Sequence, residues 1–199
     1  MAKKESKFKK FKKATKILLL TNWLVLIAVA MLAPIYAIFV DKVWWDLMDA
    51  SIAWWIFALS AWITSLISWK ITDNLKKKTN VVVFWYFLMW IWFFLYTIVD
   101  SVLFLFFVQA LIGFGEAIYS PSFDALYWNN LNKKQRWLEW GAWESMNYFT
   151  IAIWAFIWWL MVTYLWFNSI FIFMWLLCFG SWTYLYILSN HKKCKIKQK

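Results

Sequence analysis

Long apolar runs separated by short polar joints dominate this sequence. A helix that crosses the hydrocarbon core of a bilayer, about 30 Å thick, needs roughly 20 mostly apolar residues. Six runs of about this length occur, and the alternating ten-residue strand pattern of a membrane barrel does not compete with them. We therefore predict an all-α membrane protein, a bundle of six transmembrane helices. The predicted helices cover residues 17–40, 51–69, 81–99, 102–127, 146–165 and 167–188.

The polar segments divide the chain into a basic tail (1–16), the six-helix domain (17–188) and a second basic tail (189–199). Joints as short as residues 100–101 predict that the helices on either side are antiparallel neighbours. The first apolar run is too long for the apolar core of a signal peptide, so we expect it to be retained as a helix.

Basic residues gather on one side of the predicted membrane. Of the 21 lysines and arginines, all except Lys42 lie in the two tails or beside the joints that follow the second and fourth predicted helices. Lysine-rich short loops stay in the cytoplasm. We therefore expect a multi-pass protein of the plasma (inner) membrane with both termini cytoplasmic. The formal net charge of +11 then reflects this topology and attraction to anionic lipid, not nucleic-acid binding.

The residue types that carry most enzyme chemistry are scarce. Cys178 lies inside the sixth predicted helix, while Cys194 and the only histidine, His191, lie in the C-terminal tail. The predicted helices contain no Ser/His or Cys/His pair and no metal-ligand spacing. We expect no catalytic site, no metal site and no cofactor.

The joint between the second and third predicted helices has a distinctive sequence, "WKITDNLKKK". It resembles the signature loop of the major facilitator superfamily, G-x-L-x-D-x-x-G-[RK]-[RK]. Asp73 matches the aspartate, and Lys77 and Lys78 match the basic pair, whereas Trp69 and Lys76 stand at the two glycine positions. The resemblance implies a structural role for Asp73, which we expect to contact a neighbouring helix start or a basic side chain.

The fourth predicted helix extends the resemblance. The segment "QALIGFGEAIYSPSFDALYWNN" is similar to the fourth helix of that superfamily in its G-x-G and in its proline after a small residue. The resemblance implies a fold like one half of a twelve-helix transporter, whose first and fourth helices line the central cavity. Asp124, near the cytoplasmic end, is expected to form a structural ion pair with Arg136 of the next joint, or with Lys77 or Lys78.

Polar residues along this helix fall on one stripe at 100° per residue. Polar groups within a membrane are costly and usually functional. We predict that Gln109, Glu116 and Ser120 form a substrate or ion pathway, with Glu116 as a protonatable or cation-binding group. A carboxylate paired inside the bundle is the alternative for Glu116.

Two functions follow from these patterns. The first is a secondary active transporter of a small solute, an exporter, with protons as a candidate coupling ion. The second is a non-transporting membrane subunit or scaffold. We expect a complete half-size chain that works as a parallel homodimer, because a lone half would leave its polar stripe facing lipid. A separately encoded partner half, or a longer gene, are the alternatives.

Tryptophan is unusually frequent, with 20 residues against 4 glycines. Trp55, Trp62 and Trp69 recur every seven residues, and Trp154 and Trp158 occupy glycine positions of an exporter motif. Membrane tryptophans normally gather at the interfaces, whereas small residues at regular spacing let helices approach closely. The codon UGA means tryptophan in some bacterial codes and glycine in others. We hypothesise that most of these positions are UGA codons that the cell reads as glycine.

The hypothesis predicts UGA at most of the 20 positions, with Trp140 and Trp143 as ordinary tryptophans because they match no glycine motif. Reading the codons in the gene tests it. UGG throughout would contradict it and would leave a tryptophan-rich protein with wide helix spacing.

Overall fold

The computed structural model describes residues 11–32, 46–164, 167–190 and 196–197. The described chain is all-α and has six helices. They are α1 (Lys13–Leu32), α3 (Leu47–Asn74), α4 (Lys78–Leu95), α5 (Val102–Asn130), α6 (Arg136–Tyr164) and α7 (Phe167–Asn190). Five of them, α1, α3, α4, α5 and α7, are long and apolar enough to cross a membrane. The prediction of a helical, multi-pass membrane protein is confirmed at this level.

The remaining helix, α6, has 29 residues but is not one of those five. Its first half carries Arg136, Glu139 and Glu144, which are costly in hydrocarbon. The side chains of several residues in its second half lie outside the described part of the chain.

The helices run further into the joints than the apolar runs predict. α3 continues past Trp69 to Asn74, and α5 continues past Tyr127 to Asn130. Apolarity marks the stretch that suits hydrocarbon, but backbone hydrogen bonding carries a helix on into the polar joint. α5 begins at a cap, because the Ser101 side chain accepts a hydrogen bond from the Phe104 N–H at 3.3 Å. Residues 33–40 of the first predicted helix lie outside the described residues.

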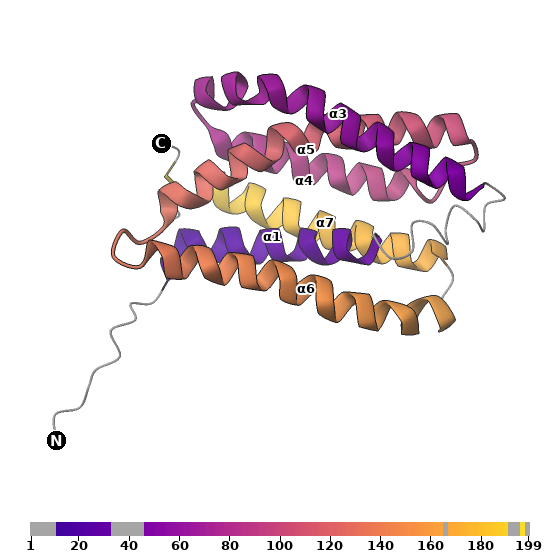
Figure 1. The fold of residues 1–199 in the computed structure, drawn as a ribbon. Coiled ribbons are helices and arrows are strands. Elements are labelled where there is room, and N and C mark those ends of the chain that lie inside the picture. The colour runs from indigo at the N-terminus through magenta and orange to yellow at the C-terminus, as the bar shows by residue number, and fades with distance from the viewer. Residues whose placement is uncertain (1–10, 33–45, 165–166, 191–195, 198–199) are drawn as a thin grey trace.

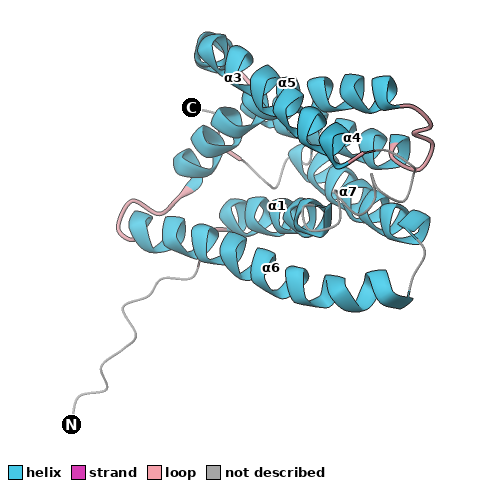
Figure 2. Ribbon diagram, turned by 45° about the vertical axis from the view of Figure 1, so that its right-hand side comes forward, coloured by secondary structure: helices cyan, strands magenta, loops and turns pink. Residues whose placement is uncertain are grey.

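Figure 1 shows the helices side by side in the order α3, α5, α4, α7, α1, α6, and the pairs that pack against each other give the same order. Among helices that follow one another in sequence, α4 and α5 pack together, as their short joint predicts. α6 instead packs against α1, and α7 packs against α4 and α1. Figure 2 shows α3 and α6 on opposite flanks of the bundle.

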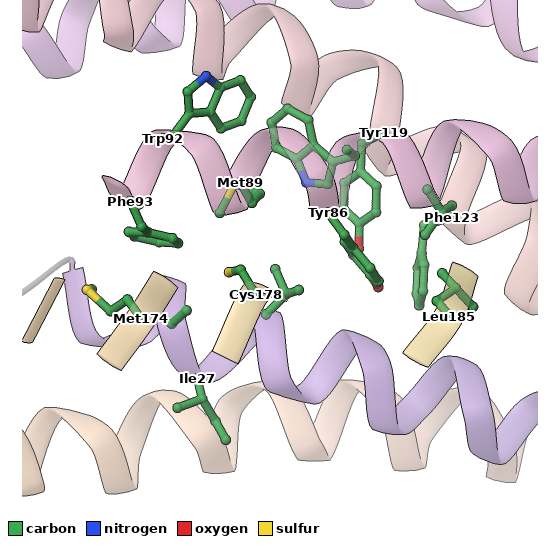
Figure 3. Close-up of a cluster of buried hydrophobic side chains, with 14 of the residues drawn as sticks. Ile27, Tyr86, Met89, Trp92, Phe93, Tyr119, Phe123, Met174, Cys178 and Leu185 are labelled. Carbon is green, nitrogen blue, oxygen red and sulfur yellow. The ribbon is translucent and has the colours of Figure 1, made fainter. Parts of the chain in front are cut away.

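The buried core forms between the inner helices α1, α4, α5 and α7. Figure 3 shows Tyr86 of α4, Phe123 of α5 and Cys178 of α7 turned toward this region, and each is almost fully buried. Hydroxyl groups tie the same helices together. The Ser181 hydroxyl donates to the Thr21 carbonyl at 2.7 Å, and the Thr15 hydroxyl donates to the Asn130 carbonyl at 3.0 Å.

The joints that are rich in basic residues share one end of the bundle. The start of α1, the end of α3, the start of α4, the end of α5 and the start of α6 all lie there (Figure 1). The Lys12 ammonium donates to the Leu131 carbonyl at 2.7 Å, and Asn130 exchanges two hydrogen bonds with the backbone of Lys197. Segments from both ends of the chain thus meet at the α5–α6 joint. The cytoplasmic location of this end remains a prediction from charge.

A close approach at Gly113 joins the outer helix α3 to α5. A Cβ at Gly113 would overlap the Phe57 carbonyl oxygen and lie 3.1 Å from the Ala61 nitrogen. One turn away, the Ser60 hydroxyl donates to the Ala110 carbonyl at 2.7 Å. The neighbours at Gly113 are backbone atoms, so they cannot move aside without displacing a helix.

We expect Gly113→Ala to destabilise the protein by about 1–3 kcal/mol, because the added methyl overpacks the α3–α5 contact. Gly180→Ala is the matched control, since a Cβ there meets nothing within 4 Å, and alanine is the better helix former. Thermal unfolding in mild detergent measures both. Equal melting temperatures for the two variants would contradict the close approach.

Candidate functional site

A cavity of about 210 Å³ lies between α1, α3, α4 and α5. Its wall is mainly apolar and aromatic, and a few polar side chains interrupt it. The polar members are Asn22, Tyr96, Gln109, Glu116 and Tyr119. Ligand pockets of this composition are typically about 300–1,000 Å³. The present cavity is smaller, so it suits a small molecule or an ion.

Glu116 is the only charged residue among the described residues that line this cavity. It is partly buried, and within the described chain its carboxylate has neither an ion pair nor a hydrogen bond. The paired alternative for Glu116 is therefore not what the structure shows. An unpaired charge is costly inside a bundle and is retained mainly where it has a function.

Asn22 of α1 organises the polar part of the wall. Its side-chain oxygen accepts a hydrogen bond from the Tyr119 hydroxyl at 2.6 Å and a longer one from the Tyr86 hydroxyl at 3.4 Å. The two tyrosines lie next to each other between α5, α4 and α1 (Figure 3). Both bonds use the side-chain oxygen of Asn22. Its amide NH₂ group donates no hydrogen bond to any described residue.

Gln109 lies on the same cavity wall, further toward the start of α5. Its NH₂ group donates to the Tyr96 hydroxyl at 3.1 Å. The Tyr96 ring is in turn stacked on Phe171 of α7, with centroids 5.4 Å apart. The Gln109 amide is fixed by its nitrogen, and its oxygen has no hydrogen-bond donor within the described structure.

The predicted pathway is therefore only partly assembled in the cavity. Gln109 and Glu116 line it, but Ser120 does not, and its side chain is exposed. One turn beyond Glu116 the interior is filled by Tyr119 and Phe123, whose ring centroids are 5.7 Å apart. A stripe on a helix shows which residues share a face, whereas packing by neighbouring helices decides how far a cavity extends along it.

The acidic and basic residues of the predicted signature loop do not contact one another. Asp73 lies exposed in the last turn of α3, and Lys77 is exposed at the cap of α4. The Lys78 ammonium donates to the Leu75 carbonyl at 3.5 Å. In the described residues Asp73 makes no ion pair, so the expected contact is wrong for this structure. Since α3 continues to Asn74, the carboxylate lies at a helix C-terminus, where the macrodipole disfavours a negative charge.

The expected ion pair between Asp124 and Arg136 is also not formed. The Arg136 guanidinium lies over the Trp128 ring, 4.3 Å from its centroid, a favourable cation–π position. Trp128 is one turn closer to the α5–α6 joint than Asp124, so the arginine reaches the Trp128 ring first and packs on it. Asp124 is partly buried and has no cationic partner in the described part of the chain.

Sequence reasoning missed Asn22 and its tyrosine partners. A signal was present, because Asn22 is the most polar residue in the apolar run "ILLLTNWLVLIAVAML", and polar residues inside a membrane helix are usually functional. The tyrosines gave no such signal, since tyrosine is common both in cores and at interfaces.

No protein-family model matches this chain, and no curated protein matches its sequence significantly. The resemblance of two segments to the major facilitator superfamily is thus not supported by a match over the chain. The findings identify a six-helix, all-α protein with five candidate membrane-spanning helices, for which a lipid bilayer is the expected environment.

Proposed function

We propose that this protein is a secondary active transporter that exports a small solute across the plasma membrane. The observation that carries the proposal is the unpaired Glu116 carboxylate in an interior cavity walled by four helices. Carboxylates inside a membrane helix bundle often mark ion and substrate pathways. The likeness of the α3–α4 joint and of α5 to the major facilitator superfamily gives additional support.

In this proposal Glu116 carries the coupling step. With a cation or a proton bound, the carboxylate is neutralised, and the cost of enclosing it in a closed, dry cavity falls. After release, the free charge favours a conformation that is open to water. Solute binding next to Glu116 would then be linked to the same change of access, as in transporters whose sites lie between repeats near the membrane midplane.

Two copies of the chain would form the working unit. An axis along the membrane normal relates the two halves of many transporters. Support comes from α3, which lies on a flank of the bundle with only 17% of its apolar window buried, against 56% for α1. Exposed Ser120 on the adjoining helix α5 gives this side a polar group that a second copy would cover.

A change of Glu116→Gln should abolish coupled transport and leave the fold intact, because the amide is isosteric but cannot carry the charge. Solute flux in proteoliposomes, with and without an imposed proton gradient, measures this effect. The matched control is Asp100→Asn in the exposed α4–α5 joint, which should transport normally. Unchanged gradient-dependent flux in Glu116→Gln would remove Glu116 from the mechanism. An absence of flux in the unmodified protein would favour a membrane subunit or scaffold.

A homodimer that buries the α3–α5 side predicts a specific cross-link. In a Cys194→Ser background, Ser120→Cys should give covalent dimers under mild oxidation. Phe156→Cys, exposed on the opposite flank in α6, should not. Native mass measurement in mild detergent should show two chains. A clean monomer that still transports in proteoliposomes at one chain per vesicle would contradict the dimer.

A further inference from the structure

We propose that the cavity between α1, α3, α4 and α5 binds a small organic ammonium compound, an amine in its protonated form. This inference rests on the proposed transport function and deepens it by naming the substrate class. It is carried by the set of polar groups in the cavity that remain unpaired, together with the apolar character of the rest of the wall.

Charge gives the first step of the argument. Glu116 is the one charged group of the lining in the described chain, and it has no cationic partner there. Asp124, about two turns further along α5, is also acidic and has no cationic partner among the described residues. Acidic groups without a described cationic partner favour a positively charged ligand, because opposite charges attract strongly where the dielectric is low.

Hydrogen bonding gives the second step. An ammonium has N–H donors and no acceptor, and the cavity offers two acceptors, the Glu116 carboxylate and the Gln109 amide oxygen. The Asn22 NH₂ adds two N–H donors, which fit a hydroxyl or carbonyl oxygen on the ligand. Asn22 and Gln109 are only 3% and 2% exposed, and bonds to tyrosine hydroxyls fix both amides. The site is therefore built before a ligand arrives.

The remaining wall suits an organic cation better than a bare metal ion. Calcium takes about 6–8 oxygen ligands, and the described residues contain no group of three or more His, Cys, Asp or Glu that could hold a metal. Aromatic rings such as those of Phe93 and Tyr119 line the cavity instead, and their faces attract organic cations. At about 30 Å³ per water molecule, 210 Å³ leaves room for a small aryl- or alkylamine only.

The tryptophan hypothesis does not alter this chemistry. Trp54, Trp85 and Trp92 also line the cavity, and glycine at these positions would enlarge it. Glu116, Gln109 and Asn22 are unaffected, so the sign of the preferred charge stays the same.

Three compounds of similar shape test the inference: 2-phenylethylamine, 2-phenylethanol and phenylacetate. Calorimetric titration of the purified protein in lipid nanodiscs at neutral pH measures the binding of each. We expect the ammonium to bind at least about tenfold more tightly than the alcohol, with no detectable binding of the anion. Equal binding of amine and alcohol, or tighter binding of the anion, would overturn the proposal.

Variants connect the preference to the named groups. Glu116→Gln should remove the preference for the amine, while Glu116→Asp, which keeps the charge, should retain it. Asp100→Asn should bind like the unmodified protein. A preference that survives in folded Glu116→Gln would overturn the assignment.

The binding assay separates this inference from the transport proposal. Amine binding without flux of labelled 2-phenylethylamine in proteoliposomes would overturn transport and support the ammonium site. Proton-coupled flux of other solutes by a protein that does not bind the amine would overturn the substrate class and support transport.

Discussion

The cost of an unpaired polar group in an apolar bundle is the constraint on which this structure depends. Helices satisfy their own backbone, and hydrocarbon offers no other partner. Most short polar side chains bond to the backbone of their own helix, and a few bond to the backbone of a neighbouring helix, as Ser181 does to Thr21 and Ser60 does to Ala110. The bonds between helices also fix which helices are neighbours. Unpaired groups that remain inside are therefore informative, and here three of them, on Asn22, Gln109 and Glu116, line one cavity.

The helices were predictable from sequence because a bilayer demands long apolar runs, and this demand acts on each run separately. Their order in space was not predictable, since it depends on side-chain fit between distant segments. Asp124 and Arg136 illustrate the difference. Their opposite charges and nearby positions favour an ion pair, but the Trp128 ring lies closer to the start of α6 and holds the arginine. The sequence alone marked Glu116 as a site residue, because a carboxylate inside a membrane helix is rare. That Ser120 lies outside the cavity could be seen only from the packing of Tyr119 and Phe123.

Some of the tryptophans do not meet the requirement that buried polar groups be paired. The indole N–H group of Trp90 is buried without a hydrogen-bond partner in the described structure, and such a group costs about 1–3 kcal/mol. A Cβ at Gly115 would overlap the Trp85 ring, so this indole fits only because its neighbour is glycine. These features are what large side chains produce at positions where a bundle favours small ones.

Close packing and polar pairing make different demands at the cavity. The Gly113 contact between α3 and α5 needs a small residue and no particular charge. The ligand group that binds the Glu116 carboxylate needs a positive charge, and it can bind whether the cavity is small or large. If glycine occupies positions 54, 85 and 92 in the cell, α3 and α4 lose indole surface toward α5, and the polar groups of α1 and α5 keep their partners. Asn22 would still be held by Tyr119, and Gln109 by Tyr96. The size of the ligand thus depends on the tryptophan positions, and its charge depends on residues that the genetic code leaves unambiguous.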